Sequence, residues 1–302
     1  NQTPKDFVVT EVPLYEFSND GEHLILKIAK KGISSWEALG IISSNCGIPI
    51  KEIGYAGLKD KQAYTLQHIS INRKFEPNLE RLSDERLKVV ERFYHKNKIK
   101  QGHLKGNKFF IRVKKLNPID AKKVQSAVLG IKKYGIPNFF GYQRFGRDGE
   151  NAKRGQELCK EGKKRFNYKD EFFINAYQSE LFNAWLAKRI EISKIVDGFS
   201  DKECALALGF DRDEIGILKA QSHPFKLMKG EIYCHYPHGK LFTDEDILEQ
   251  SRRFIEQKIS PTGLLCGVKS EVASSRAGEI ERAFTDGADR KSTRLNSSHE
   301  SP

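Results

Sequence analysis

The stretch "GYAGLKDKQAYTLQ" (residues 54–67) joins a glycine-containing loop to a strand-like apolar pattern. Asp60 lies in this loop between Lys59 and Lys61. Positive neighbours favour the ionised form of a carboxyl group, and glycines allow a substrate to approach the backbone closely. The pattern therefore suits a nucleophilic carboxylate, but it also suits an ordinary solvated turn, and the spacing alone does not separate the two.

The segments around this loop carry strand and helix patterns. Residues 34–47 predict a helix, because Ser34 and Glu37 have capping-box spacing and Gly47 follows the last apolar position. Alternating or β-branched runs predict strands over 6–17, 22–31, 64–71 and 107–116. The last of these is expected to be half-buried, with a basic outer face.

The second half of the chain has mostly helical patterns. Helices are predicted over 118–135, 171–190, 244–259 and 277–284. A strand-rich front and a helix-rich back indicate two domains with a boundary near residue 150. Residues 289–302 have no periodicity and no apolar anchor, and they resemble translated adapter sequence. They are therefore expected to be a non-native tail.

The positive charge of the chain is concentrated in one block. The net charge is +12, yet residues 92–147 contain 15 Lys or Arg and one acid, so the rest of the chain is slightly negative. Aromatic side chains are interleaved with this block. Because basic groups neutralise phosphates and rings stack on unpaired bases, the block predicts nucleic-acid contact. The alternative is a solvated basic face over core aromatics.

The loop "PNFFGYQRFGRDG" (137–149) lies at the end of this block. Asn138 offers donors and acceptors, and Arg144 and Arg147 suit phosphate groups. The loop fits an RNA-facing segment with a stacking ring about as well as it fits a structural corner.

Several function classes find no support in the sequence. No apolar run approaches the roughly 20 residues of a membrane helix, and no signal peptide opens the sequence. The five cysteines form no CxxC pair, which favours a reducing compartment and hence the cytoplasm. Cys234, His235 and His238 lack an evident fourth ligand, so we expect no metal. The absence of nucleotide-binding and hydrolase motifs predicts no cofactor.

Five segments in order resemble the signatures of the TruD family of pseudouridine synthases. They are "PKDFVVTEV", "GYAGLKDKQAYTLQ", "GHLKGNKFFIRV", "IPNFFGYQRFGRDGEN" and "NAYQSELFNAWL". The resemblance runs to about Phe284. It implies an α+β fold, in which a pseudouridine-synthase catalytic domain on an antiparallel or mixed sheet (1–150) is interrupted by a mostly helical TruD-type insertion (151–288).

The resemblance also implies a reaction and a site. The family isomerises uridine 13, in the D-arm of tRNA, to pseudouridine without cofactor or metal. Asp60 corresponds to the nucleophile, Phe7 and Asn138 to substrate contacts, and Phe140 to the ring that stacks on the flipped base. Candidate contacts to the RNA backbone are Lys59, Lys61, Lys105, Arg144 and Arg147.

The sequence also departs from the family pattern. No "GSxAT"-like motif follows Phe284, so the chain is expected to be a fragment without the family's C-terminal catalytic strands. We therefore retain two alternatives, a catalytically incompetent truncated synthase and a non-catalytic RNA-binding protein. An RNA methyltransferase is disfavoured because no glycine-rich strand–helix turn is present. A monomer is the favoured oligomeric state.

Overall fold

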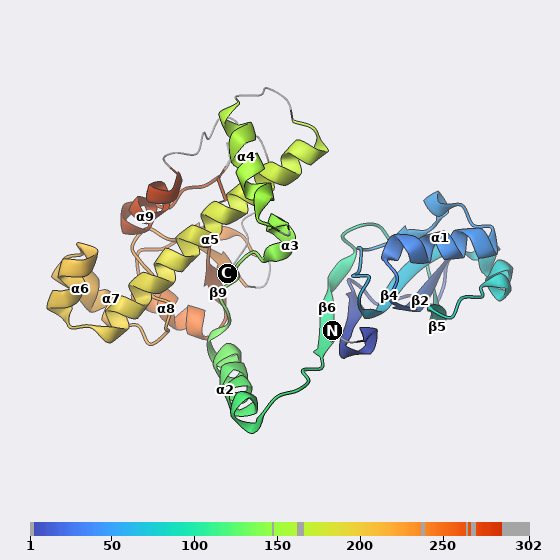
Figure 1. Cartoon of the computed structure of the whole chain (residues 1–302), viewed down its shortest axis with the longest axis horizontal. Helices are drawn as coiled ribbons and strands as arrows, with labels where there is room; N and C mark the ends of the chain where they lie inside the picture. Colours follow the sequence, from blue (N-terminus) through green and yellow to red (C-terminus); the bar gives the residue numbers. More distant parts are fainter. Residues whose placement is uncertain are drawn as a thin grey trace. The chain divides into compact units, whose positions relative to one another are not determined.

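The computed structural model describes residues 3–146, 148–161, 166–236, 239–263, 265–266 and 270–285. The chain forms two compact units, divided in sequence between Ala121 and Lys122, and each is described here by itself (Figure 1). The expected tail, 289–302, lies outside the described residues. The predicted α+β class is confirmed, because the first unit is built on a mixed sheet and the second is mainly helical.

A sheet of six strands organises the described part of the first unit. Its strands are β1 (Phe7–Pro13), β2 (His23–Lys31), β3 (Gly54–Tyr55), β4 (Tyr64–Asn72), β5 (Leu87–His95) and β6 (Leu104–Ile111). The order is β5-β2-β4-β1-β6, and β3 pairs with β4. β1 is parallel to β4, whereas the other pairings are antiparallel. The sheet is therefore mixed, as the resemblance implied.

Helix α1 (Ser35–Cys46) lies across one face of this sheet (Figure 1). The Ser34 hydroxyl accepts a hydrogen bond from the Glu37 amide, and Gly47 ends the helix with φ of 66°, as the sequence predicted. Apolar side chains of α1 pack on those of β2 and β4, and they form the main core of the unit. Short 3₁₀ helices complete it: η1 (Pro4–Asp6), η2 (Ile50–Glu52) and η3 (Arg73–Arg81).

Strand β6 differs from its predicted form. The expected strand over 107–116 ends at Ile111, and the side chains of Phe109, Phe110 and Ile111 are 61%, 54% and 61% exposed. β6 is the last strand of the sheet order, and five of its eight residues are exposed. The prediction of a half-buried strand was therefore wrong.

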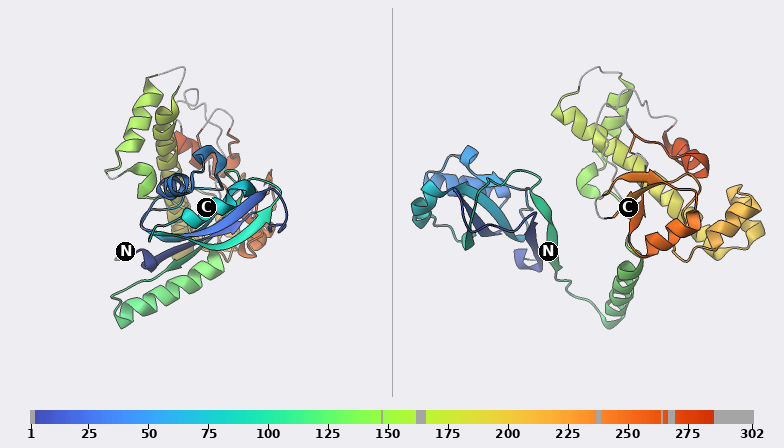
Figure 2. Two further views of the ribbon diagram at one scale, coloured as in Figure 1. Left: turned by 90° about the vertical axis from the view of Figure 1, so that its right-hand side faces the viewer. Right: turned by 180° about the vertical axis from the view of Figure 1, so that it is seen from behind.

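The second unit is arranged around α5, which lies beside α4 in Figures 1 and 2. Its helices are α2 (Pro118–Tyr134, beginning in the first unit), α3 (Tyr142–Phe145), α4 (Glu150–Lys160), α5 (Tyr168–Gly198), α6 (Asp201–Leu208), α7 (Arg212–Lys219), α8 (Ile247–Ile255) and α9 (Ser275–Thr285). A small sheet, which the sequence did not predict, has the order β8 (Leu241–Thr243), β7 (Ile232–His235), β9 (Ile259–Pro261). These strands are too short for a clear alternation pattern.

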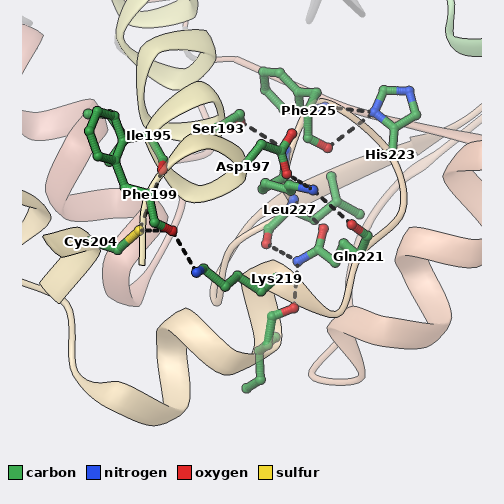
Figure 3. A network of polar contacts seen from close by, with 12 residues as sticks. Ser193, Ile195, Asp197, Phe199, Cys204, Lys219, Gln221, His223, Phe225 and Leu227 are labelled. Carbon is green, nitrogen blue, oxygen red and sulfur yellow. Dashed lines mark hydrogen bonds and ion pairs between the residues drawn. The ribbon is translucent and has the colours of Figure 1, made fainter. Parts of the chain in front are cut away.

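A buried polar network fastens the segment after α7 to α5 (Figure 3). The Lys226 ammonium pairs with the Asp197 carboxylate at 2.6 Å and donates to the Gln221 carbonyl at 2.8 Å. The Gln221 side chain bonds both backbone groups of Leu227. The network satisfies buried polar groups and explains how this irregular segment remains in the core. No helix in the described part of the chain is long and apolar enough to span a bilayer.

Candidate active site

Asp60 is exposed on the loop between β3 and β4, and a buried lysine holds its backbone. Lys30 lies near the end of β2, with no exposed surface. Its ammonium donates to the carbonyls of Ile33 at 2.7 Å, Asp60 at 2.8 Å and Lys59 at 3.4 Å. The three donors of an ammonium thus match three carbonyls, and this fixes the loop under the carboxylate.

A second set of hydrogen bonds holds the same loop. The Ser35 hydroxyl accepts from the Lys59 amide at 2.8 Å and donates to the Gln67 side chain at 3.0 Å. Gln67 in turn donates to the Gly57 carbonyl at 2.7 Å. Because these side chains come from the packed elements α1 and β4, the loop is preorganised.

The Lys59 side chain points into the protein. Its ammonium lies 2.8 Å from the Glu11 carboxylate, and the two side chains are 5% and 1% exposed. The other Glu11 oxygen accepts from the His68 amide at 3.0 Å. Burial raises the pKa of Glu11, but hydrogen bonds from His68 and Lys59 outweigh it and lower the pKa overall. We expected Lys59 to contact the RNA backbone; the structure instead gives its ammonium a buried partner.

This pair gives a stability prediction. Replacing Glu11 by alanine is expected to lower the free energy of unfolding by about 3–5 kcal/mol, because the Lys59 charge would stay buried without its partner. Urea denaturation followed by circular dichroism measures the change. The matched control is Glu91→Ala, which breaks the more exposed Lys27–Glu91 pair of the same sheet and should cost about 1 kcal/mol or less. Equal losses in the two variants would contradict the prediction.

Phe7 lies at the same end of the sheet as Asp60. Val9, Thr65 and Lys30 are paired in register across β1, β4 and β2, so their side chains share one face. Phe7 is on that face two residues earlier, and its ring stacks on Phe109 with centroids 6.0 Å apart and planes 4° apart. A half-exposed aromatic pair therefore lies on the face and at the end of the sheet that carry the Asp60 loop.

The residue before Phe7 anchors this end of β1. Asp6 is buried, accepts from the Thr3 amide at 3.0 Å and pairs with the Lys114 ammonium at 2.7 Å. The hydrogen bond from Lys114 lowers the pKa of Asp6, although desolvation opposes it. The "PKDF" segment is therefore held by the chain that follows β6.

The other basic candidates of the first unit are exposed. Lys61 pairs with Glu37 at 3.0 Å, with both side chains largely in solvent, and Lys105 is exposed on β6. An exposed pair of this kind is weak enough to exchange for a phosphate. Their contact with RNA stays a prediction.

The remaining candidates belong to the second unit. Asn138 is exposed and lines a largely apolar pocket of about 570 Å³ with Leu186, His223 and Phe254. Phe140 is half-buried, and its backbone is bonded twice by Asn183, at 2.9 Å each.

The Phe140 ring already has partners on the protein. It meets the Phe182 ring edge-on at 5.5 Å, and the Arg144 guanidinium lies 5.1 Å from its centroid. Arg147 lies outside the described residues. Phe7 and Asp60 therefore lie at one end of the sheet of the first unit, whereas Asn138 and Phe140 belong to the second unit.

Comparisons with known proteins agree on one family. The family model for tRNA pseudouridine synthase D (TruD) matches residues 1–166. A Wolinella succinogenes protein named tRNA pseudouridine synthase D is 50% identical over 288 residues, covering 94% of this chain and 80% of the relative. The chain belongs to the TruD family. A Helicobacter pylori member (strain 26695) is 45% identical over 294 residues, covering 94% of this chain and 77% of its own.

The fold of the TruD family is also seen in a solved structure. A crystal structure of a Methanosarcina mazei protein that carries the name tRNA pseudouridine synthase D matches with a TM-score of 0.63 at 20% identity. It covers 96% of this chain and 78% of that one. At this identity the match supports the TruD fold alone.

The cysteine–histidine segment, where no metal was expected, makes other contacts. Cys234 contacts the carbonyls of His235 and Gly239, and the His235 ring stacks on Phe242 with centroids 4.5 Å apart. His238 lies outside the described residues. Among the residues that the structure describes, no group of three or more His, Cys, Asp or Glu is arranged to hold a metal ion.

Sequence reasoning missed the polar side chains that hold the Asp60 loop. Three such side chains lie in predicted strands and are buried, namely Lys30, Glu11 and Gln67. A lysine in a strand normally indicates a solvent-facing position. The one available signal was that Glu11 interrupts the apolar run "DFVVTEVP" on the face of Phe7 and Val9.

The pKa of Lys30 gives a pH-dependence prediction. Burial and the positive charge of Lys59 lower this pKa from 10.5 to about 8, although Asp60 and Glu37 oppose the shift. Between pH 8 and 10.5 the unfolded chain therefore keeps a proton that the folded chain releases. The contribution of Lys30 to stability then rises with pH in this window, by at most about 3 kcal/mol. Urea denaturation at pH 7 and pH 10 should show this rise relative to Lys30→Met, and parallel behaviour of the two proteins would contradict it.

Proposed function

We propose that this chain isomerises uridine to pseudouridine in tRNA, at position 13 of the D-arm, with Asp60 as the nucleophile. The assignment of Asp60 rests on one observation, the way its loop is held. An exposed carboxylate stands on a backbone held by Lys30 and Gln67, at the sheet end that carries the Phe7–Phe109 pair. The names of the TruD relatives supply the reaction and the substrate.

The chemistry needs a nucleophile that adds and later leaves. The Asp60 carboxylate attacks either C1′ of the ribose or C6 of the uracil, and the bond between N1 and C1′ breaks. The uracil turns, its C5 bonds to C1′, and the bond to Asp60 breaks. The hydrogen on C5 leaves as a proton, and N1 takes up a proton, so atoms and charge balance. No electrons are gained or lost overall, so we propose that the reaction needs no cofactor and no metal.

The target base must leave its stack before this chemistry, at a cost of a few kcal/mol. Phe7, and Phe140 from the second unit, are the rings that we propose to contact the flipped base, with Asn138 bonding its edge. Lys61, Lys105, Arg144 and Arg147 are the proposed contacts to phosphates. Asp60 must stay accessible in this scheme, and its exposure supports that requirement.

The remaining features of the proposal follow from the family. We propose that residues 1–150 are the N-terminal part of the catalytic domain and that 151–288 are the insertion. We further propose that the protein acts as a monomer in the cytoplasm, where its tRNA substrate is found. Size-exclusion chromatography with light scattering tests the oligomeric state.

The direct test is tritium release from tRNA labelled with tritium at C5 of uridine. Release equivalent to one uridine per tRNA, with the product mapped to position 13, is the expected result. Release that maps elsewhere would contradict the assigned position. Tight tRNA binding without release would favour the alternatives, an incompetent synthase or a non-catalytic RNA-binding protein.

A further inference from the structure

A second basic site lies in the first unit, at a pocket of about 450 Å³ that we call the distal pocket. It is lined by three histidines and three lysines, with Tyr15 and Asn97. These are His23, His95, His103, Lys96, Lys98 and Lys100. None of these lining residues is acidic, although the turn before β2 contains Asp20 and Glu22. The proposed reaction uses none of these residues.

The distal pocket forms where several strands meet, at the end of the sheet opposite Asp60. His23 begins β2, His95 ends β5, and His103 directly precedes β6. Lys30, which holds the Asp60 loop, is at the other end of β2. At a rise of roughly 3.3 Å per residue, β2 separates the two ends by about 26 Å.

The loop that carries the lysines is held in place. The Ile99 amide donates to the Ser70 hydroxyl at 2.9 Å, and the Gly102 amide donates to the Ala56 carbonyl at 2.9 Å. Gly21 packs so closely on this segment that a Cβ there would lie 2.5 Å from the His95 carbonyl carbon, at φ of 127°. The pocket is therefore formed before any ligand binds.

The histidines of this pocket present donors. The Nδ1 atom of His95 accepts from the Ser18 amide at 3.3 Å, and the Nδ1 atom of His103 accepts from the Lys100 amide at 3.4 Å. In each ring the remaining proton is then on Nε2, which can donate. Burial, followed by repulsion from His23 and Lys96, lowers the pKa of His95. An anion in the pocket would relieve this repulsion.

We infer that the distal pocket binds a phosphate group, which in the tRNA substrate is a backbone phosphate remote from the reacting uridine. Ring N–H groups and ammonium groups without a lining carboxylate match the acceptor oxygens of a phosphate. The identification of the phosphate as part of tRNA rests on the proposed function, whereas the anion site rests on the pocket alone. The pocket gives the enzyme a second point of contact that positions the RNA.

The test is the double variant Lys96→Gln/Lys100→Gln, in which both changed side chains are exposed. The matched control, Lys74→Gln/Lys88→Gln, removes two exposed lysines of the same unit that do not line the pocket. For the pocket variant we expect tRNA affinity to fall about tenfold and the slope of log affinity against log salt to decrease by about 2. The rate at saturating tRNA should stay within twofold, because the pocket is far from Asp60.

Two further measurements distinguish binding of free phosphate from binding of tRNA, and failure of the pocket from failure of the proposed function. Inorganic phosphate should shift the ring-proton NMR signals of His95 and His103 in the wild type and not in the pocket variant. Such shifts without loss of tRNA affinity would overturn the RNA assignment, and no shifts would overturn the anion site. An equal loss of tRNA affinity in the control variant Lys74→Gln/Lys88→Gln would overturn the assignment of the pocket to tRNA. The wild type could release no tritium while the pocket variant, but not the control variant, loses tRNA affinity. In that case the proposed function fails and the pocket assignment stands.

Discussion

Replacing Asp60 by asparagine is expected to reduce tritium release from labelled tRNA on the order of 10⁴-fold or more. The amide has nearly the shape of the carboxylate, so the loop held by Lys30 and Gln67 should keep its form. It lacks the negative oxygen that must bond to the uridine and leave again. Because the hydrogen bond from Lys30 reaches the Asp60 backbone carbonyl, and the side-chain carboxylate accepts none from the described residues, stability should change little.

Binding distinguishes this result from loss of structure. The Asp60→Asn variant should bind tRNA within about twofold of the wild type, since the phosphate contacts are made elsewhere. Asp20→Asn is the matched control, because Asp20 is also an exposed carboxylate in a loop of the same unit. Full activity in the Asp60 variant would show that another group is the nucleophile.

Replacing Lys30 by methionine is expected to lower the rate at saturating tRNA by about 100-fold. Methionine fills a similar volume but donates no hydrogen bond, so the carbonyls of Asp60, Lys59 and Ile33 lose their shared donor. A shift of about 1 Å in a reacting group can cost about 10² in rate. Single-turnover tritium release measures this loss directly.

The control for Lys30 lies on the same strand. Lys27→Met removes a lysine of β2 whose ammonium pairs with Glu91 near the surface, and it should leave the rate within twofold. The Lys30 variant should keep its tRNA affinity, because Lys30 has no exposed surface for RNA to contact. A folded Lys30→Met protein with normal turnover would show that the loop does not need this support.

Local patterns predicted much of the fold. β2, β4, α1 and α2 were predicted within about one residue of their bounds, because apolar periodicity and helix capping depend on neighbouring residues. The three short strands of the second unit were not predicted, since β7, β8 and β9 are stabilised by pairing with each other. β6 was predicted as half-buried because alternation does not reveal whether any element covers a face.

The site was predictable only in part, because local sequence patterns do not reveal which distant residues come into contact. The family resemblance identified Asp60 and Phe7, and the register of β1 and β4 places both at one end of the sheet. Lys30 and Glu11 could not be identified from local sequence. Their partners, the Asp60 carbonyl and the Lys59 ammonium, are 30 and 48 residues away and arrive only in the folded state. Buried polar groups of this kind are found from the contacts that satisfy them.

The pairing of β1 with β6 has a consequence for synthesis on the ribosome. Phe7 is opposite Ile111, so the edge of the sheet can close only after more than 100 further residues have been made. At roughly 5–20 residues per second, β1 waits about 5–20 s with one edge open. Its parallel partner β4 arrives earlier, and it can hold β1 in place during this interval. We therefore expect the sheet of the first unit to be completed only after Ile111 has been made, and its apolar strands to depend most on chaperones before that point.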